Sequence, residues 1–279
     1  MSFHRLERDA WQSPSVARAY SEGFLPVTVH LAEPLLRAVR AGAGTLLADV
    51  ACGPGTVAHR AAALGSRVVA VDFSRAMLEM ARRGPEGLLA VQGSATRLPL
   101  APGTFDAVVS NFGLLHFPAP DRAIAEAVEA LRPGGRAAWS VWGEDAVALK
   151  LIPRCLEALG LHPSLPAGPG FFQFGAPGPF AAALRAAGLE KIETHRFSWD
   201  AKFPDTDAFW RTFEEGTART RASIRALAPA ERRDLRAEVD RQLQGFRSGS
   251  GLAVPTSALL AVGARPLGPA GAPSAPATG

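Results

Sequence analysis

The chain has 279 residues, 47% of them hydrophobic, which is enough to bury one large α/β core. Its 30 basic and 26 acidic residues leave a formal charge of only +4, and the Arg-rich stretch 205–247 also carries many Asp and Glu. A nucleic-acid-binding protein would gather its basic residues into a stripe, so nucleic acid is not expected as a partner of this chain. The two cysteines, Cys52 and Cys155, belong to no CxxC or Cys/His cluster, which predicts no metal site and fits a reducing cytoplasm.

The N-terminal residues do not have the pattern of a signal peptide. Residues 1–13 include Arg5, Glu7, Arg8 and Asp9 where such a peptide needs an apolar run. No window approaches the ~18 uninterrupted apolar residues of a membrane span. A cytoplasmic protein without a membrane partner, either a monomer or a homodimer, is therefore expected.

From Leu46 onward, short apolar runs alternate with Ala-rich helical stretches, which is typical of βαβ units that build a parallel sheet. Pro133-Gly134-Gly135 is expected to end a helix sharply and to play a structural role. In chain order the predicted elements are the strand Leu46–Val50, the helix Thr56–Leu64, the strand Arg67–Val71, a helix capped by Ser74, the strands Leu89–Gln92 and Phe105–Asn111, the helix Arg122–Leu131 and the strand Ala137–Trp142.

After Trp142 the regular alternation is lost. Two excursions from the sheet, residues 144–175 and 204–249, are interpreted as a helical substrate cap. The tail 266–279 has no periodic apolar pattern and is expected to be disordered. The elements predicted in this half are the helix Val147–Leu159, a Gly/Pro/Phe-rich loop over 163–179, the helix Phe180–Ala187, the strand Lys191–Phe197, the helices Asp207–Ala226 and Pro229–Leu243, and the strand Ser257–Ala264.

A glycine turn, Gly53-Pro54-Gly55, joins the first strand to its helix. Glycine lets the backbone approach a ligand closely, and the ligand then meets free N–H groups at the helix start. The turn with Asp72 also matches the spacing of a dinucleotide site, so this segment alone permits NAD. Asp49 at the strand end favours S-adenosylmethionine (SAM), because SAM carries a cationic amine and a sulfonium and has no pyrophosphate.

Two motifs further along the chain identify a family. The first is Gly93-Ser94-Ala95 followed by Leu98-Pro99-Leu100 and Thr104-Phe105-Asp106, and the second is Leu131-Arg132-Pro133-Gly134-Gly135. With them, residues 20–136 resemble the type 11 family of class I SAM-dependent methyltransferases, which includes the ubiquinone/menaquinone-biosynthesis C-methyltransferases. The resemblance implies a Rossmann-like, mostly parallel, seven-stranded α/β sheet with helices on both faces and an antiparallel last strand. It also implies one domain over 1–265, with a SAM-binding core (41–143) and an N-terminal lid (1–40).

The same resemblance implies roles for individual residues around SAM. Asp72 would hold the ribose hydroxyls, although it could instead cap the helix at Ser74. The family usually has an acidic residue where Ser94 stands. The implied cofactor-binding residues are Tyr20 of the lid, Asp49, Ala51, Gly53 and Gly55 around the methionine part, Asp72 on the ribose, Phe73, Met77, Ser94 and Ala95 around adenine, and Asn111 beside the transferred methyl group.

The acceptor side is less specified by the sequence. His116 leaves the fourth strand at the edge where ligands of open α/β folds bind, so it is the candidate catalytic base, with a structural hydrogen bond as the alternative. Aromatic residues of the two excursions could line an apolar pocket or only pack the cap onto the core. These candidates are Phe171, Phe172, Phe174, Trp210 and Phe213.

The sequence thus predicts transfer of a methyl group from SAM to an O, N or C atom of a small, partly apolar metabolite, leaving S-adenosylhomocysteine (SAH). Two other functions remain open. One is a SAM-binding fold with a non-methylating role, such as a cyclase or a regulator. The other is an NAD-dependent oxidoreductase, for which no Tyr-x-x-x-Lys pair is present because Tyr20 is the sole tyrosine.

Overall fold

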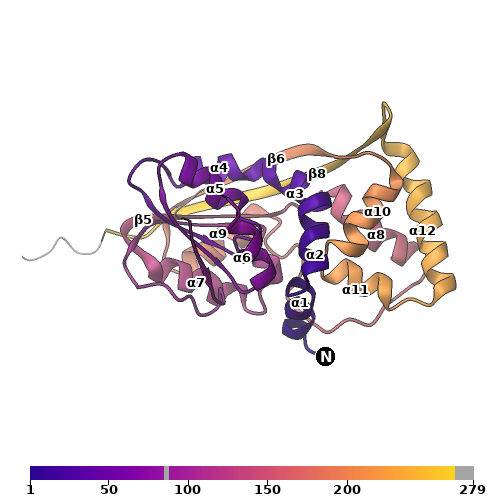
Figure 1. Cartoon of the computed structure of the whole chain (residues 1–279), viewed down its shortest axis with the longest axis horizontal. Coiled ribbons are helices and arrows are strands. Elements are labelled where there is room, and N and C mark those ends of the chain that lie inside the picture. The colour runs from indigo at the N-terminus through magenta and orange to yellow at the C-terminus, as the bar shows by residue number, and fades with distance from the viewer. Residues whose placement is uncertain (85–87, 268–279) are drawn as a thin grey trace, which may run out of the picture.

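A mixed β-sheet forms the centre of the computed structural model, which describes residues 1–84 and 88–267 (Figure 1). The strand order is β3-β2-β1-β4-β5-β8-β6, with β1 to β5 parallel and β8 antiparallel to both of its neighbours. The predicted seven-stranded sheet with an antiparallel last strand is confirmed, and a two-residue strand pairs with β8 in addition. The strands are β1 Leu46–Val50, β2 Arg67–Asp72, β3 Leu89–Gln92, β4 Phe105–Asn111, β5 Leu131–Trp142, β6 Glu190–Phe203, β7 Arg247–Ser248 and β8 Gly251–Ala264.

Helices cover both faces of this sheet. Successive residues of β1 point to opposite sides, so Leu47 packs in one hydrophobic cluster and Ala48 in the other. The helices α4 (Ala32–Ala38), α5 (Thr56–Ala63) and α6 (Arg75–Ala81) lie on one face, and α7 (Pro120–Ala130) and α9 (Pro177–Ala186) on the other (Figure 1). Burial from both sides explains why the central strands read as continuous apolar runs.

The lid and the cap lie beyond the carboxyl ends of the parallel strands. Figure 1 shows the lid helices α1 (Phe3–Trp11) and α2 (Pro14–Ala19) between the sheet and the cap helices. The lid continues through the π-helix η1 (Tyr20–Phe24), α3 (Leu25–Thr28) and η2 (Val29–Leu31) to α4. The cap helices are α8 (Val147–Ala158), α10 (Thr206–Glu215), α11 (Arg219–Arg225) and α12 (Pro229–Leu243).

Strands β6 and β8 are much longer than the predicted Lys191–Phe197 and Ser257–Ala264. They pair continuously from Glu193 with Val262 to Phe203 with Leu252, and they run from the sheet to the cap (Figure 1). The outer part of β6 continues a local strand pattern beyond the predicted end, because Trp199, Ala201 and Phe203 alternate with exposed polar residues and pack toward the core. Pairing with β8 runs over this whole segment.

The predicted helix Asp207–Ala226 is two helices in the structure. The chain breaks at Gly216, where an added Cβ would lie 2.9 Å from the backbone nitrogen of Tyr20. Glycine is required there because the lid backbone approaches so closely, and glycine also favours a helix end. The break separates α10 from α11.

Smaller differences concern element ends. Helices α7 and α9 begin at Pro120 and Pro177, earlier than predicted, because proline is favoured in the first helical turn. The Pro133–Gly135 segment is part of β5, at an irregularity where the register with β4 shifts from Phe105–Leu131 to Ala107–Arg136. The tail prediction from residue 268 onward lies outside the described residues, and no described helix is long and apolar enough to cross a membrane.

Candidate functional site

The turn after β1 has an unusual backbone. Ala51, Gly53 and Gly55 all adopt positive φ angles, of 56°, 54° and 89°. Phe112, after β4, is also left-handed at 55°, and Ala51 and Phe112 lack the freedom of glycine. Such residues cost on the order of 1–3 kcal/mol each and gather at functional sites. The carboxyl ends of β1 and β4 are therefore held in conformations that the surrounding fold must stabilise.

Asp49, at the end of β1, is a buried carboxylate that forms no ion pair in the part of the chain that the structure describes. One oxygen, Oδ2, accepts a hydrogen bond from the Ala58 backbone nitrogen at 3.0 Å, whereas Oδ1 has no partner among the described residues. Burial is the main cause that raises the pKa of Asp49 to about 7; the Ala58 hydrogen bond lowers this pKa and the charge of Asp72 raises it. An unpaired carboxylate oxygen in a buried site fits a cationic amine as ligand.

Asp72, at the end of β2, organises two turns. Its Oδ2 accepts from the Gly53 nitrogen at 2.9 Å and its Oδ1 from the Ser74 nitrogen at 2.8 Å. Burial raises the pKa of Asp72, although both hydrogen bonds lower it. Ser74 is the N-cap of α6, as predicted, and its Oγ also donates to the Trp11 carbonyl of the lid at 2.6 Å.

Asn111 ends β4 and links that strand to the lid. Its Nδ2 donates to the Thr28 carbonyl at 3.2 Å, and its Oδ1 accepts from the Ser140 hydroxyl at 2.6 Å. These two bonds fix the amide at the edge of the sheet. Gly113 follows at a crowded position, where a Cβ would lie 2.5 Å from Ser110 Oγ.

These strand ends surround a small hollow of about 70 Å³, which we call the strand-end cleft. Seven of the predicted cofactor residues line it, and Asp49 borders a smaller cavity that also touches Tyr20 and Asn111. The cleft is lined by Trp11, Tyr20, Ala51, Gly53, Asp72, Phe73, Met77, Asn111, Phe112, Gly113, His116 and Phe117.

Besides Asp49, three predicted cofactor residues do not line the cleft. Gly55 is the N-cap of α5, and a Cβ there would lie 2.7 Å from His59 Nε2. Ser94 is exposed and pairs with the Thr96 hydroxyl, and Ala95 is buried in the hydrophobic core. Their cofactor roles stay predictions.

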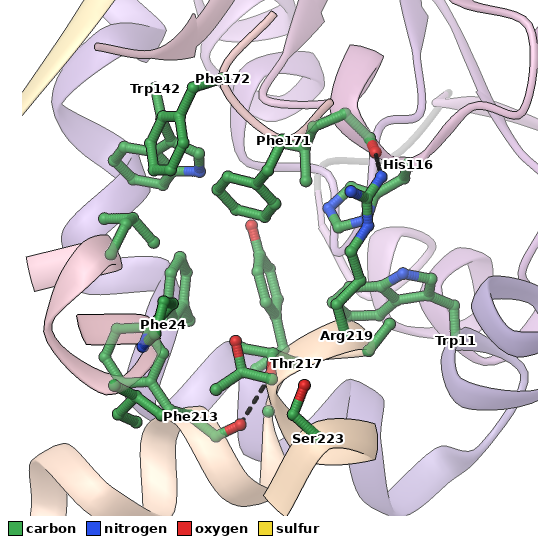
Figure 2. A pocket seen from close by; sticks show the side chains of 18 of the residues that line it. Trp11, Phe24, His116, Trp142, Phe171, Phe172, Phe213, Thr217, Arg219 and Ser223 are labelled. Carbon is green, nitrogen blue, oxygen red and sulfur yellow. Dashed lines mark hydrogen bonds between the residues drawn. The ribbon is translucent and has the colours of Figure 1, made fainter. Parts of the chain in front are cut away.

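A second and larger hollow of about 290 Å³, the aromatic cavity, lies between lid and cap. Figure 2 shows Trp142, Phe172 and Phe24 on one side of it and His116, Arg219 and Trp11 on the other. Of the predicted substrate residues, Phe171, Phe172 and Phe213 line this cavity. The other two do not, because Phe174 stacks on Phe180 at 5.5 Å and Trp210 bonds to Glu214.

The two hollows share three lining residues: Trp11, Tyr20 and His116. The Trp11 ring lies edge-on to both of the others, with ring centres 5.5 Å from Tyr20 and 5.1 Å from His116. Burial raises the pKa of the Tyr20 hydroxyl, which lies 3.4 Å from the Thr28 hydroxyl. The wall between the hollows is therefore built from the lid and from the loop after β4.

A buried carboxylate that the sequence did not point to lies behind this wall. Glu7 of α1 is 2% exposed, and its Oε2 lies 2.9 Å from His116 Nδ1 and from Trp11 Nε1. Its Oε1 accepts from Arg219 Nε at 3.1 Å. Glu7 stands among charged residues at the N-terminus and gives no local signal, because its partners lie up to 212 residues away.

Comparison with known proteins places the chain in a family. A methyltransferase domain model matches residues 48–139. A demethylmenaquinone methyltransferase of Clavibacter sepedonicus is 43% identical over 103 residues, which are 36% of this chain and 42% of that one. The chain thus spans less than half the length of that relative. A ubiquinone/menaquinone biosynthesis C-methyltransferase of Methylobacterium nodulans is 33% identical over 170 residues, covering 54% of this chain and 67% of the relative.

Solved structures share the fold. A phosphoethanolamine N-methyltransferase of Haemonchus contortus, in complex with S-adenosyl-L-methionine, superposes with a TM-score of 0.59 at 18% identity, covering 95% of this chain and 60% of that one. At such low identity, this similarity shows a shared fold and nothing more. The family model and the sequence relatives show that this chain belongs to the type 11 methyltransferase family. The strand order and the strained strand ends agree with this family.

Proposed function

We propose that the chain binds SAM in the strand-end cleft and transfers its methyl group to a small, partly apolar molecule held in the aromatic cavity. The observation that carries this proposal is the shared wall of Trp11, Tyr20 and His116 between the two hollows. A donor on one side and an acceptor on the other would meet at that wall. Holding two reactants at near-attack distance supplies much of the barrier reduction in such a transfer.

The unpaired oxygen of Asp49 supports SAM as the donor, because the amine of its methionine part would neutralise this carboxylate. In our proposal Asp72 accepts from the ribose hydroxyls with its remaining lone pairs, and Phe73 and Met77 flank the adenine. Ala51 and Gly53 bring backbone close to the methionine part. Bound SAM supplies a methyl carbon activated by the sulfonium, and the carbon–sulfur electron pair stays on sulfur in SAH.

The size of the strand-end cleft has a consequence for binding. At about 70 Å³ it is smaller than the roughly 300–1,000 Å³ of pockets that hold drug-sized ligands. Trp11 and Tyr20, which narrow it, belong to the lid. The lid would therefore shift outward to admit SAM and then close over it.

A small acceptor is favoured over a polymer because lid and cap both contribute to the walls of the aromatic cavity. Aromatic rings form much of that wall, and hydroxyls of Thr217 and Ser223 lie among its few polar groups (Figure 2). An aromatic or polycyclic ring with one polar end fits this lining.

Calorimetric titration tests the donor. We expect SAM and SAH to bind and NAD to give no heat of binding. Binding of NAD(H) without any response to SAM would overturn the proposal in favour of an oxidoreductase.

Transfer is then tested by incubating the protein with methyl-labelled SAM and a set of naphthols, hydroxyquinones and aromatic amines. Label in a product supports methyl transfer. SAM binding without label in any product would favour the non-methylating role.

A further inference from the structure

The buried carboxylate of Glu7 joins three parts of the molecule. It lies on the lid helix α1, accepts from His116 after β4, and accepts from Arg219 at the start of cap helix α11. Burial raises the pKa of Glu7, but the charge of a protonated His116, the charge of Arg219 and the hydrogen bonds from His116 and Trp11 outweigh burial and leave the pKa lowered. Glu7 is therefore a carboxylate at neutral pH and acts only as an acceptor.

Arg219 is held so firmly that it is a poor ligand for an acceptor molecule. Its Nη1 donates to the Pro169 carbonyl at 2.9 Å, and its Nη2 donates to the Leu115 carbonyl. With its Nε on Glu7, every nitrogen of the guanidinium is bonded within the protein. Its charge compensates that of Glu7, which makes a buried carboxylate tolerable at this position.

The contact with Glu7 determines which nitrogen of His116 carries the proton. A carboxylate 2.9 Å from Nδ1 requires a hydrogen there. Nε2 of a neutral His116 then keeps its lone pair, and the ring lines both hollows. The charged groups around the imidazole are Glu7, Arg219 and, across the strand-end cleft, Asp72.

We propose that Glu7 is a positioning residue that fixes His116 as a proton acceptor, and that the methyl acceptor is consequently the oxygen of an acidic hydroxyl, a phenol or an enol. This inference rests on the proposed function. A base oriented by a third group is the usual means of activating a hydroxyl, which is a weak nucleophile when protonated. An aromatic amine already has a free lone pair at neutral pH and needs no such base before it reacts.

The protons and electrons balance in this step. The acceptor O–H bond breaks and its proton moves to Nε2 of His116. The oxygen electron pair forms the new O–CH3 bond, and the electron pair of the broken carbon–sulfur bond remains on sulfur. The imidazolium cation that results is paired with Glu7, and it returns its proton to solvent when the lid opens.

The tautomer of His116 gives a test that needs no ligand. In ¹⁵N-histidine-labelled protein we expect NMR to show Nδ1 protonated and Nε2 bare for the His116 ring, assigned by comparison with H116A. Protonation of Nε2 in the neutral ring of the wild type would overturn the proposal.

The acceptor class is tested with 2-naphthol, whose fluorescence distinguishes phenol from phenolate. In the SAH-loaded protein we expect bound 2-naphthol to ionise at lower pH than free 2-naphthol. Glu7→Gln should lower the ionisation constant of bound 2-naphthol roughly tenfold and so reduce this shift, since a charge-assisted hydrogen bond becomes a neutral one. His116→Ala should abolish it.

Two controls separate position from charge. Asp9→Asn removes an exposed carboxylate from the same helix and should change nothing. The ligand 2-methoxynaphthalene lacks the hydroxyl and should bind equally to wild type and Glu7→Gln.

Failure of 2-naphthol to bind, or an ionisation shift that survives in both variants, would overturn the inference. A wild type that does not bind SAM in calorimetry would instead refute the proposed function.

Discussion

The edge of the sheet and the space between lid and cap are built in different ways. At the sheet edge, the polar groups lie at the carboxyl ends of β1, β2 and β4, so short motifs place them and the backbone of the turns forms part of the wall. Between lid and cap, the wall is made of side chains from α1, η1, α8, α10 and α11, together with His116, Trp142 and the loop that holds Phe171 and Phe172. A donor common to a family suits the first arrangement, and a variable acceptor suits the second.

This contrast predicts that substitutions at the sheet edge act on SAM and that those in the cap do not. The largest effect is expected for Asp49→Asn. Breaking a buried charge pair costs about 3–5 kcal/mol, so SAM affinity at pH 8 should fall on the order of 100-fold or more. Calorimetry measures this, with Asp9→Asn as the matched control. Wild-type affinity in the variant would remove Asp49 from the donor site.

Asp49 should also make the ligand-free protein sensitive to pH. Its pKa is about 7 when folded and about 4 when unfolded, so the folded state holds the proton more tightly. Wild-type stability should therefore decrease as pH rises from about 4 to 7, by up to roughly 4 kcal/mol relative to Asp49→Asn. Urea unfolding of both proteins at several pH values measures the difference, and parallel curves would contradict it.

A smaller loss is expected for Asp72→Ala. The substitution removes a charged carboxylate that would accept hydrogen bonds from the ribose hydroxyls. Such a loss costs about 1.5–3 kcal/mol, so SAM affinity should fall roughly 10- to 100-fold. Because Asp72 also bonds to the Gly53 and Ser74 nitrogens, a thermal melt must accompany the titration. Unchanged affinity in a folded variant would reduce Asp72 to a structural role.

The smallest effect on SAM is expected for Phe172→Ala in the cap. SAM affinity should stay within about twofold, whereas 2-naphthol binding should fall roughly tenfold through lost aromatic contact. A fall in SAM affinity as large as that of Asp72→Ala would contradict the assignment of SAM to the sheet edge and of the acceptor to the cap.

The sequence predicts the two regions unequally for a physical reason. The central strands β1 and β4 were predicted to the residue because they are mostly apolar, the edge strand β3 was predicted from a short apolar run, and Ser74 is recognisable as a cap from its own neighbours. The outer half of β6 carries a local alternation that extends beyond the predicted end at Phe197. The Gly216 break, in contrast, depends on the approach of Tyr20, and that signal is not local.

The candidate site divides in the same way. Residues such as Asp72 and Phe73 follow from motifs of a few residues. The contact of Glu7 with His116 and Arg219 joins positions 109 and 212 residues apart, so only the folded chain brings these side chains together.

The π-helix η1 carries one more residue per hydrogen-bonded turn than an α-helix. Deleting a single residue from Tyr20–Phe24 would restore the α-helical spacing and turn α1 and α2 by about 100° relative to the chain that follows. Glu7 and Trp11 would then leave their positions although both remained in the sequence. The length of this segment is thus as much a determinant of the site as the identity of its side chains, and among relatives an insertion or deletion here would signal a rebuilt acceptor side.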